Sequence, residues 1–265
     1  MMPIIEARSI GKHYDIPGGE LEVLRDLSFH IEPGELVTFV GPSGCGKSTL
    51  FNILTGLLPP TSGQVWVQGR DTTGSTSPEI GYVLQKDLLL PWRTMLQNVV
   101  IGLEVRRVPR REAHARARSL FEQYAMAGFE DRYPGEVSGG MRQRAALMRT
   151  MITEPEVILM DEAYKALDYP LKIELESELL QTVRRERKAV VFVTHDIEEA
   201  VTLSDRVYVL RARPGQIVEE IEVDLGVDST RIEERRLAPR FNQYYERIWQ
   251  GIGRPETADR GQEAA

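Results

Sequence analysis

The sequence predicts an α/β fold in which strands and helices alternate around a layered core. Strand-like and helix-like patterns alternate along the second half of the chain, at residues 157–160, 169–188, 189–193, 197–203 and 207–210. The first of these runs is apolar throughout, as is typical of a strand buried in a parallel sheet. Residues 3–40 are rich in strand signals, whereas residues 95–128 are helical and rich in arginine. This change in composition indicates a separate helical lobe between about residues 86 and 153.

The bulk composition is that of a globular protein with an ample core. The chain has 265 residues, 42% of them apolar and 28% charged, which allows one large domain or two modest ones. A formal charge of −7 argues against a nucleic-acid-binding surface. The single cysteine excludes an internal disulfide and favours a reducing compartment.

The sequence carries no recognisable targeting or membrane-spanning segment. Residues 1–6 have neither the basic start nor the apolar core of a signal peptide. No apolar run approaches the ~20 residues needed to cross a bilayer. We therefore expect a soluble, cytoplasmic protein, and any membrane span must come from another chain.

The first part of the chain is predicted to be β-rich. Runs at residues 4–10 and 27–31 flank turn signals at residues 17–19, and an apolar strand pattern follows at residues 36–40. Further strands are predicted at residues 64–67, 80–84 and 216–223.

A glycine-rich turn joins the strand at 36–40 to a helical pattern at 49–57. It reads Gly41-Pro42-Ser43-Gly44-Cys45-Gly46-Lys47-Ser48-Thr49. Its spacing and context are those of a phosphate-binding loop, in which backbone N–H groups and a helix N-terminus bind phosphate oxygens. Lys47 would reach the β- and γ-phosphates of a nucleotide, and the Ser48 hydroxyl would ligate Mg²⁺. The alternative is a glycine-rich turn that binds nothing. Cys45 lies inside the loop and is interpreted as a small side chain that fills a tight turn, with a catalytic role as the alternative.

Two carboxylates, Asp161 and Glu162, directly follow the apolar strand at 157–160. The strand carries Asp161 at its C-terminal end, where the carboxylate can contribute to the coordination of Mg²⁺. Glu162 could accept a proton from an attacking water. Solvated surface charge is the alternative, but the four apolar residues before the pair favour a buried position.

The stretch Ser138-Gly139-Gly140 precedes a helical pattern at residues 141–152. Two glycines expose N–H groups at a helix N-terminus, which favours an anion. Followed by Met141-Arg142-Gln143, this stretch resembles the ATPase signature of ATP-binding-cassette (ABC) proteins. In that family the signature caps the γ-phosphate of ATP held by the opposite subunit.

The resemblance covers roughly residues 3–250 and implies a domain organisation. It implies an ABC ATPase domain at residues 1–250, and residues 251–265 are predicted to form a disordered tail. The implied fold is a P-loop NTPase core with a mixed or parallel sheet and an N-terminal antiparallel β subdomain. A helical subdomain at about residues 86–153 is inserted into this core.

Further positions match the family's motifs. Gln85 matches the switch glutamine that senses Mg²⁺ and water, and His195 matches the switch histidine that contacts the γ-phosphate. Tyr14 matches the aromatic residue that stacks on adenine, and Ala166-Leu167-Asp168 matches the loop that touches the neighbouring subunit. The implied catalytic residues are Glu162, His195 and Gln85, and the implied metal ligands are Ser48, Gln85 and Asp161.

The implied function is ATP hydrolysis with Mg²⁺, coupled to solute translocation by a membrane ABC transporter. The implied partners are a second copy of the chain, integral membrane permease subunits and, indirectly, an extracytoplasmic solute-binding protein, with no nucleic acid. The chain would lie peripherally at the cytoplasmic face of the membrane. Residues 89–94, 138–144 and 211–215 resemble importers of nitrate, sulfonates, taurine and related small anionic or organic solutes. The alternatives are weak or partner-dependent hydrolysis and a soluble, non-transport ABC ATPase.

The sequence departs from the family pattern after Glu162. The family usually has Pro, an aromatic residue and Gly, whereas this chain has Ala163-Tyr164-Lys165. The change is either tolerated, with the Lys165 ammonium in solvent or paired, or it weakens hydrolysis. The basic run at residues 106–118 is interpreted as a solvated helix face, with phospholipid or nucleic-acid binding as the alternative.

Overall fold

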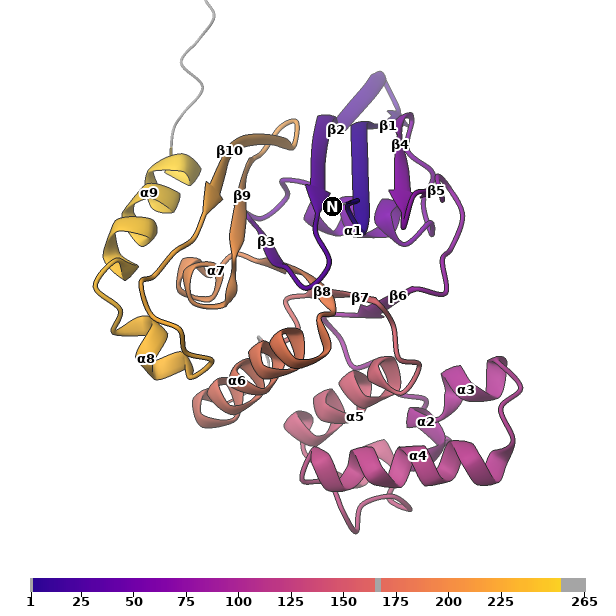
Figure 1. The fold of residues 1–265 in the computed structure, drawn as a ribbon. Coiled ribbons are helices and arrows are strands. Elements are labelled where there is room, and N and C mark those ends of the chain that lie inside the picture. Colours follow the sequence, from indigo (N-terminus) through magenta and orange to yellow (C-terminus); the bar gives the residue numbers. More distant parts are fainter. Residues whose placement is uncertain (1, 165–167, 254–265) are drawn as a thin grey trace, which may run out of the picture.

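The computed structural model describes residues 2–164 and 168–253, and in this part of the chain the strands form two sheets (Figure 1). The larger sheet has six strands in the order β10-β9-β3-β8-β7-β6. These strands are β3 (Leu36–Val40), β6 (Ile80–Val83), β7 (Val157–Asp161), β8 (Ala189–Thr194), β9 (Arg206–Arg211) and β10 (Gln216–Glu222). β10 pairs antiparallel with β9, and the other pairs are parallel. The sheet is therefore mixed, and the carboxyl ends of its parallel strands meet at one edge.

The central strands are buried on both faces, as their apolar sequences predict. Every residue of β3, β7 and β8 is buried. In β7, Val157 and Leu159 pack with α1 (Lys47–Leu54) and the smaller sheet, whereas Ile158 and Met160 pack with helices on the opposite side. This alternation produces the layered α/β architecture that the sequence predicts.

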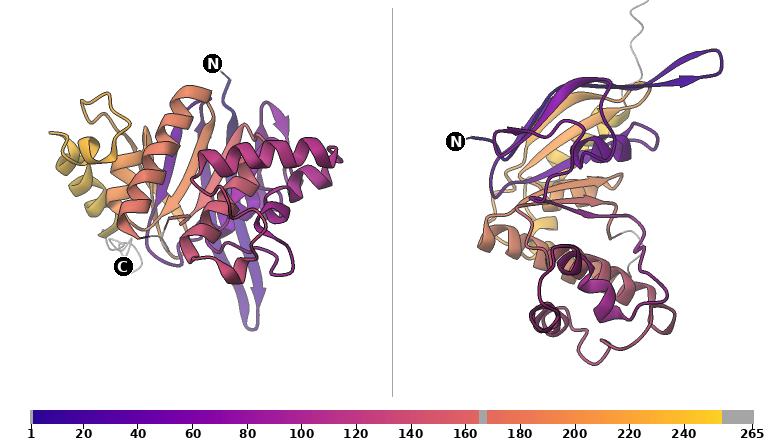
Figure 2. Two further views of the ribbon diagram at one scale, coloured as in Figure 1. Left: turned by 90° about the horizontal axis from the view of Figure 1, so that it is seen from below. Right: turned by 90° about the vertical axis from the view of Figure 1, so that its right-hand side faces the viewer.

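The smaller sheet is antiparallel and has the order β2-β1-β4-β5. Its strands are β1 (Ile5–Ile16), β2 (Gly19–Ile31), β4 (Ser62–Val67) and β5 (Arg70–Asp71). The β1–β2 hairpin is longer than the predicted runs at 4–10 and 27–31, and its outer half projects from the body of the molecule (Figure 2). The two strands stay hydrogen-bonded as far as the Ile16–Gly19 pair, but neither face of this outer part is buried. Its sequence therefore lacks the alternation of apolar and polar residues that predicts a strand.

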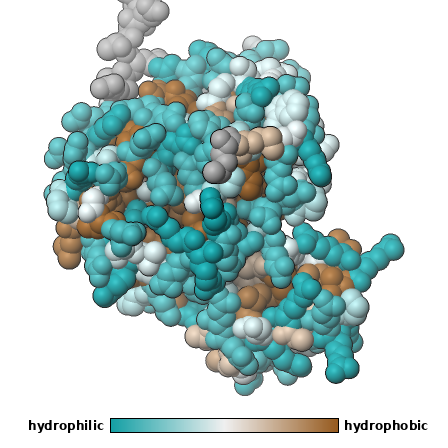
Figure 3. Space-filling view, viewed as in Figure 1, coloured by the Kyte–Doolittle hydropathy of each residue, from teal (hydrophilic) through white to brown (hydrophobic). Residues whose placement is uncertain are grey.

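Residues 86–153 contain helices as their regular elements. These are α2 (Met95–Val99), α3 (Ile101–Val105), α4 (Arg110–Gln123), a 3₁₀ turn (Pro134–Glu136) and α5 (Gly139–Met151). They form a lobe below the sheets in Figure 1, and Figure 3 shows an indentation between this lobe and the rest of the surface. The lobe shares one apolar core with the large sheet, since Phe121 and Met148 belong to the same buried cluster as Met160 and Phe192. Its arginines Arg107, Arg110, Arg111 and Arg118 lie on the solvent-exposed surface.

The remaining helices follow β7 and complete the chain. They are α6 (Tyr169–Glu186), α7 (Ile197–Leu203), α8 (Ile232–Arg236) and α9 (Phe241–Gly253). Ile248 of α9 is buried in a cluster with β9 and α7. No helix in the described ranges has both the length and the apolar character needed to cross a bilayer.

The predicted boundary of the C-terminal tail at residue 251 is wrong by three residues, because α9 continues to Gly253. Gly251 is buried, and a Cβ there would lie 3.1 Å from Val209 Cγ1, so the missing side chain lets the helix pack closely on β9. Residues 254–265 lie outside the described part of the chain.

Candidate functional site

The glycine-rich turn at residues 41–46 connects β3 to α1. Gly44 and Gly46 have φ values of +80° and +92°, which favour glycine. A Cβ on Gly46 would lie 2.4 Å from Leu24 Cδ2, and one on Gly41 would lie 2.7 Å from the Leu210 carbonyl oxygen. Side chains at Gly41 and Gly46 would therefore clash with neighbouring residues, and glycine at both positions lets the turn form. The turn leads into the N-terminus of α1.

A cleft of about 400 Å³ lies at this turn and collects residues from distant parts of the sequence. Its lining comprises Val23, Ser43, Gly44, Gly46, Lys47, Ser48, Thr49, Gln85, Asp161 and Glu162. The phosphate loop and both predicted carboxylates thus share one cleft at the carboxyl edge of the large sheet.

Lys47 is buried in the wall of this cleft. Its Nζ donates to the carbonyl oxygens of Gly41 at 2.7 Å and Pro42 at 3.0 Å. The thiol of Cys45 is also buried, and burial raises its pKa. Cys45 therefore packs as a small neutral side chain, whereas the Lys47 ammonium and the α1 N-terminus concentrate positive charge at the cleft.

A hydrogen bond joins the side chains of Ser48 and Asp161, which are 113 residues apart in the sequence. Ser48 Oγ donates to Asp161 Oδ2 at 3.2 Å, and Tyr82 Oη donates to the same oxygen at 3.4 Å. Burial raises the pKa of Asp161, and the hydrogen bond from Ser48 opposes that shift. The sequence reasoning missed Tyr82, whose place in β6 beside β7 follows only from strand pairing.

Glu162 lies between the two predicted switch residues. Gln85 Nε2 donates to Glu162 Oε2 at 2.9 Å, and His195 Nδ1 lies 2.8 Å from Glu162 Oε1. The backbone N–H of Glu162 donates to the Val193 carbonyl oxygen at 2.9 Å. Glu162 has a φ of +45°, a left-handed conformation that is uncommon outside glycine and occurs at functional sites. The turns after β6, β7 and β8 therefore converge on one carboxylate.

Two predicted groups lie away from this cleft in the single chain. Tyr14 is on the projecting β1–β2 hairpin, where Lys12 Nζ lies 5.2 Å from its ring centroid. Ser138 caps α5 by accepting from the Met141 N–H at 3.3 Å, and Ser138 and Gly139 are exposed while Gly140 is half-buried. Neither Tyr14 nor the Ser138-Gly139-Gly140 stretch lines the cleft, and α5 lies in the helical lobe, remote from α1 (Figure 1).

Side chains of α5 connect the helical lobe to the site. Gln143 Nε2 donates to the Ala163 carbonyl oxygen at 2.7 Å, directly after Glu162. Arg142 Nε donates to Oδ2 of Asp87, which lies two residues after Gln85, at 3.1 Å. No pattern in the sequence indicated Asp87. The lobe therefore contacts both chain segments that leave the cleft.

The departure from the family pattern is described only in part. Ala163 and Tyr164 are buried, and the Tyr164 ring stacks on Phe192 with centroids 5.9 Å apart. Lys165, Ala166 and Leu167 lie outside the described residues, so the expectations for Lys165 and for the predicted subunit-contact loop concern that part of the chain.

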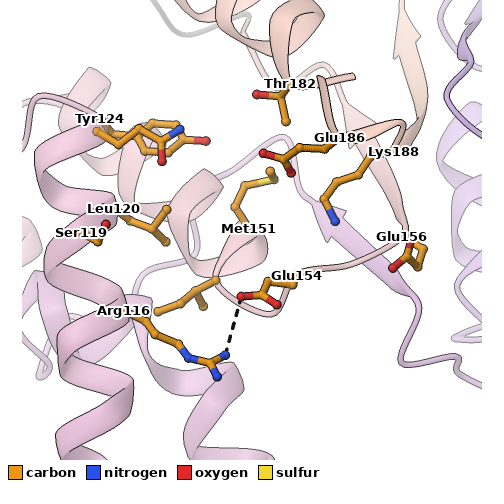
Figure 4. A pocket seen from close by; sticks show the side chains of 12 residues that line it. Arg116, Ser119, Leu120, Tyr124, Met151, Glu154, Glu156, Thr182, Glu186 and Lys188 are labelled. Carbon is orange, nitrogen blue, oxygen red and sulfur yellow. Dashed lines mark ion pairs between the residues drawn. The ribbon is translucent and has the colours of Figure 1, made fainter. Parts of the chain in front are cut away.

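A second cavity, of about 490 Å³, lies between α4, the end of α5 and the end of α6 (Figure 4). Two of its charged groups have partners: Arg116 lies 3.7 Å from Glu154, and Lys188 Nζ donates to the Pro155 carbonyl oxygen at 2.6 Å. None of the predicted site residues lines it. Lys47 and Ser48, which are predicted to bind phosphate and Mg²⁺, line the smaller cleft.

Comparisons with known proteins identify the relatives of this chain. The family model described as ABC transporter matches residues 24–165. The taurine import ATP-binding protein TauB of Pseudomonas fluorescens is 38% identical over 99% of both chains. The uncharacterized ABC transporter ATP-binding protein MJ0412 of Methanocaldococcus jannaschii is 42% identical over 83% of this chain and 82% of its own. The dimeric post-hydrolysis structure of the ATP-binding cassette MJ0796, bound to ADP and Pi, has a TM-score of 0.74 and 30% identity, and the match covers 83% of this chain and 99% of that one.

Proposed function

This chain belongs to the ABC transporter family of ATPases, and on that premise we propose that it drives import of a small anionic or organic solute. The observation that carries the proposal is the position of Glu162. Its carboxylate lies between Gln85 and His195, and Glu162 lines the same cleft as Lys47 and Ser48. This arrangement combines a phosphate cradle, a metal-binding pair and a candidate base.

In the proposed mechanism, the amides at residues 44–47 and the Lys47 ammonium bind the β- and γ-phosphates of ATP. Glu162 takes a proton from the water that attacks the γ-phosphorus, whose bond to the bridging oxygen of ADP breaks. Contacts from Gln85 and His195 to its two oxygens hold the Glu162 carboxylate in one orientation. Orientation matters because the attacking water must lie in line with the breaking bond.

Ser48 and Asp161 are the proposed ligands of Mg²⁺. Their oxygens lie 3.2 Å apart, so both would hold one Mg²⁺ ion, which would supply positive charge beside the phosphates. In the described part of the chain, no three His, Cys, Asp or Glu side chains converge on one point.

We propose that two copies of the chain enclose the nucleotide. The Ser138-Gly139-Gly140 start of α5 is accessible and faces no nucleotide cleft of its own chain, so its N–H groups can cap phosphates bound to a second copy. The relative MJ0796 is a dimer in its ADP-bound structure, which supports this arrangement. Tyr14, which is partly exposed on its hairpin, is the proposed stacking surface for adenine.

The proposed membrane partner is a permease of separate chains, with the ATPase bound peripherally at its cytoplasmic face and an extracytoplasmic solute-binding protein upstream. Trp92 and Leu88 are large apolar side chains that are exposed just after Gln85, and they are the proposed permease contact. The similarity to TauB, a taurine import protein, supports import and a sulfonate-like solute.

The test is the Glu162→Gln variant, which keeps the shape of the side chain and removes the base. We expect it to bind ATP with unchanged affinity and to hydrolyse it about a hundredfold or more slowly. Glu122→Gln, which replaces an exposed glutamate of α4, is the matched control and should retain wild-type turnover. Phosphate release is measured with and without the permease, and wild-type turnover by Glu162→Gln in both conditions would exclude Glu162 as the base.

A further inference from the structure

We propose that Lys172 and Glu199 form a buried ion pair that positions His195 for ATP hydrolysis. Lys172 lies in the first turns of α6 and Glu199 in the first turn of α7. Neither residue lines the nucleotide cleft, so both are positioning residues rather than catalytic ones. The inference rests on the proposed role of His195 in the function described above.

The Glu199 carboxylate connects α6 to the turn that carries His195. Glu199 Oε1 lies 2.5 Å from Lys172 Nζ, and Glu199 Oε2 accepts a hydrogen bond from Thr194 Oγ1. The Thr194 hydroxyl has one proton, which it donates to Glu199. Its lone pair accepts from the Asp196 N–H at 3.0 Å. The Thr194 hydroxyl therefore joins Thr194 and Asp196, the two residues that flank His195. Its orientation depends on Glu199 accepting its proton.

Lys172 strengthens the same turn from the other side. Its Nζ donates to Asp196 Oδ2 at 3.4 Å, and Asp196 caps α7 by accepting from the Glu198 N–H at 2.9 Å. The backbone N–H of Lys172 donates to the Asp168 carbonyl oxygen at 2.9 Å. The pair thus links the start of α6, which follows the chain segment leaving Glu162, with the turn between β8 and α7 (Figure 1).

The burial of this pair makes it a rigid support. Glu199 is 5% exposed, and the Lys172 side chain is 16% exposed. Nearby Glu176 is completely buried, with its carboxylate 3.8 Å from Lys172 Nζ, and burial raises its pKa to about 8. Of the two buried carboxylates, Glu199 is the closer to Lys172 Nζ, at 2.5 Å against 3.8 Å for Glu176, so Glu199 is the main partner of the Lys172 charge.

The position of the His195 ring depends on the turn that carries it, because nearly half of the side chain is exposed to solvent. Its side chain is 47% exposed, and the contact of Nδ1 with Glu162 Oε1 is the hydrogen bond that aligns it with the cleft. Loss of the Lys172–Glu199 pair would leave a buried charge without its partner and free the turn at 194–196. A shift of the turn by about 1 Å is enough to slow chemistry by a large factor.

The experiment measures kcat and KM for ATP with the full-length chain. We expect Lys172→Met to lower kcat about tenfold or more with less than a twofold change in KM or nucleotide affinity, and Lys172→Arg to restore most of the loss. Thr194→Val, which removes only the hydroxyl, should have the same effect without a charge change. Lys188→Met is the control, since Lys188 bonds the Pro155 carbonyl oxygen far from this turn and should retain kcat.

The combination with His195→Ala separates the outcomes. If the pair acts through His195, Lys172→Met should add less than twofold to the loss caused by His195→Ala. Multiplicative losses, or wild-type kcat in both Lys172→Met and Thr194→Val, would overturn the positioning role while leaving the proposed function intact. A wild-type kcat for His195→Ala would overturn the role of His195 itself, and the positioning role with it, whereas Glu162→Gln still tests hydrolysis separately.

Discussion

Replacing Glu176 by glutamine should remove a pH dependence from the free energy of unfolding. Glu176 is completely buried in α6, and neither carboxylate oxygen has a hydrogen-bond partner among the described residues. Burial is the largest cause that raises its pKa from 4.5 to about 8. The charged side chains that face it from α6, α7 and α8 are Lys172, Asp196, Glu199 and Arg236.

The magnitude follows from proton linkage. Between the unfolded pKa of 4.5 and the folded pKa of about 8, the folded chain keeps a proton that the unfolded chain has released. Stability from this group is complete below the lower value and is lost as the pH rises through the upper one. The slope is about 1.4 kcal/mol per pH unit. From about pH 5.5 to 7.5, the wild type should therefore lose roughly 2–3 kcal/mol relative to Glu176→Gln, which cannot ionise.

Urea unfolding of both proteins at several pH values across this window gives the comparison. The measured quantity is the difference in free energy of unfolding between the two proteins at each pH. Glu174→Gln, which removes an exposed carboxylate from the same helix, controls for the change in net charge. A difference that stays constant with pH would mean that Glu176 is already ionised and paired with Lys172, and the reasoning would then be wrong.

Two further predictions concern buried polar networks. Asn98 is fully buried, accepts from the Leu90 N–H at 2.7 Å and donates to the carbonyl oxygens of Leu90, Arg93 and Thr94. Asn98→Ala should therefore cost roughly 2–4 kcal/mol and lower the thermal midpoint by several degrees, whereas a shift below about 2 °C would contradict this. Arg206 pairs with Glu35 at 2.7 Å, so Arg206→Met should cost roughly 3–5 kcal/mol in urea unfolding and Glu35→Leu should recover part of the loss. Equal stability of the single and double variants would show that an unpaired Glu35 carries no penalty.

Local sequence patterns predicted the helices and strands in which buried residues recur with the repeat of that helix or strand. The helix at 197–203 has the predicted bounds, and the continuous apolar runs became β3, β7 and β8. The outer part of the β1–β2 hairpin was not predicted, because its strands are held by pairing rather than by a buried face. The predicted start of the tail, residue 251, falls inside α9, because Gly251, a helix breaker in isolation, packs against β9.

For the candidate site, motif spacing predicted residue types but not their neighbours. Lys47, Ser48, Gln85, Asp161 and Glu162 were each predicted from a local stretch, and the structure places all five in one cleft. Their chemical roles stay predictions. Tyr82 and Asp87 had no local signal, because each acts through a partner more than fifty residues away.

The sequence by itself determined the α/β architecture, the phosphate loop and the carboxylates that follow β7, because these depend on short-range periodicity and on spacing within one turn. Only the tertiary structure decided that Glu162 meets Gln85 and His195, and that Lys172 lies closer to Glu199 than to Glu176. Such choices depend on which buried groups lie within hydrogen-bond distance and which remain desolvated. Those quantities arise when distant segments pack together.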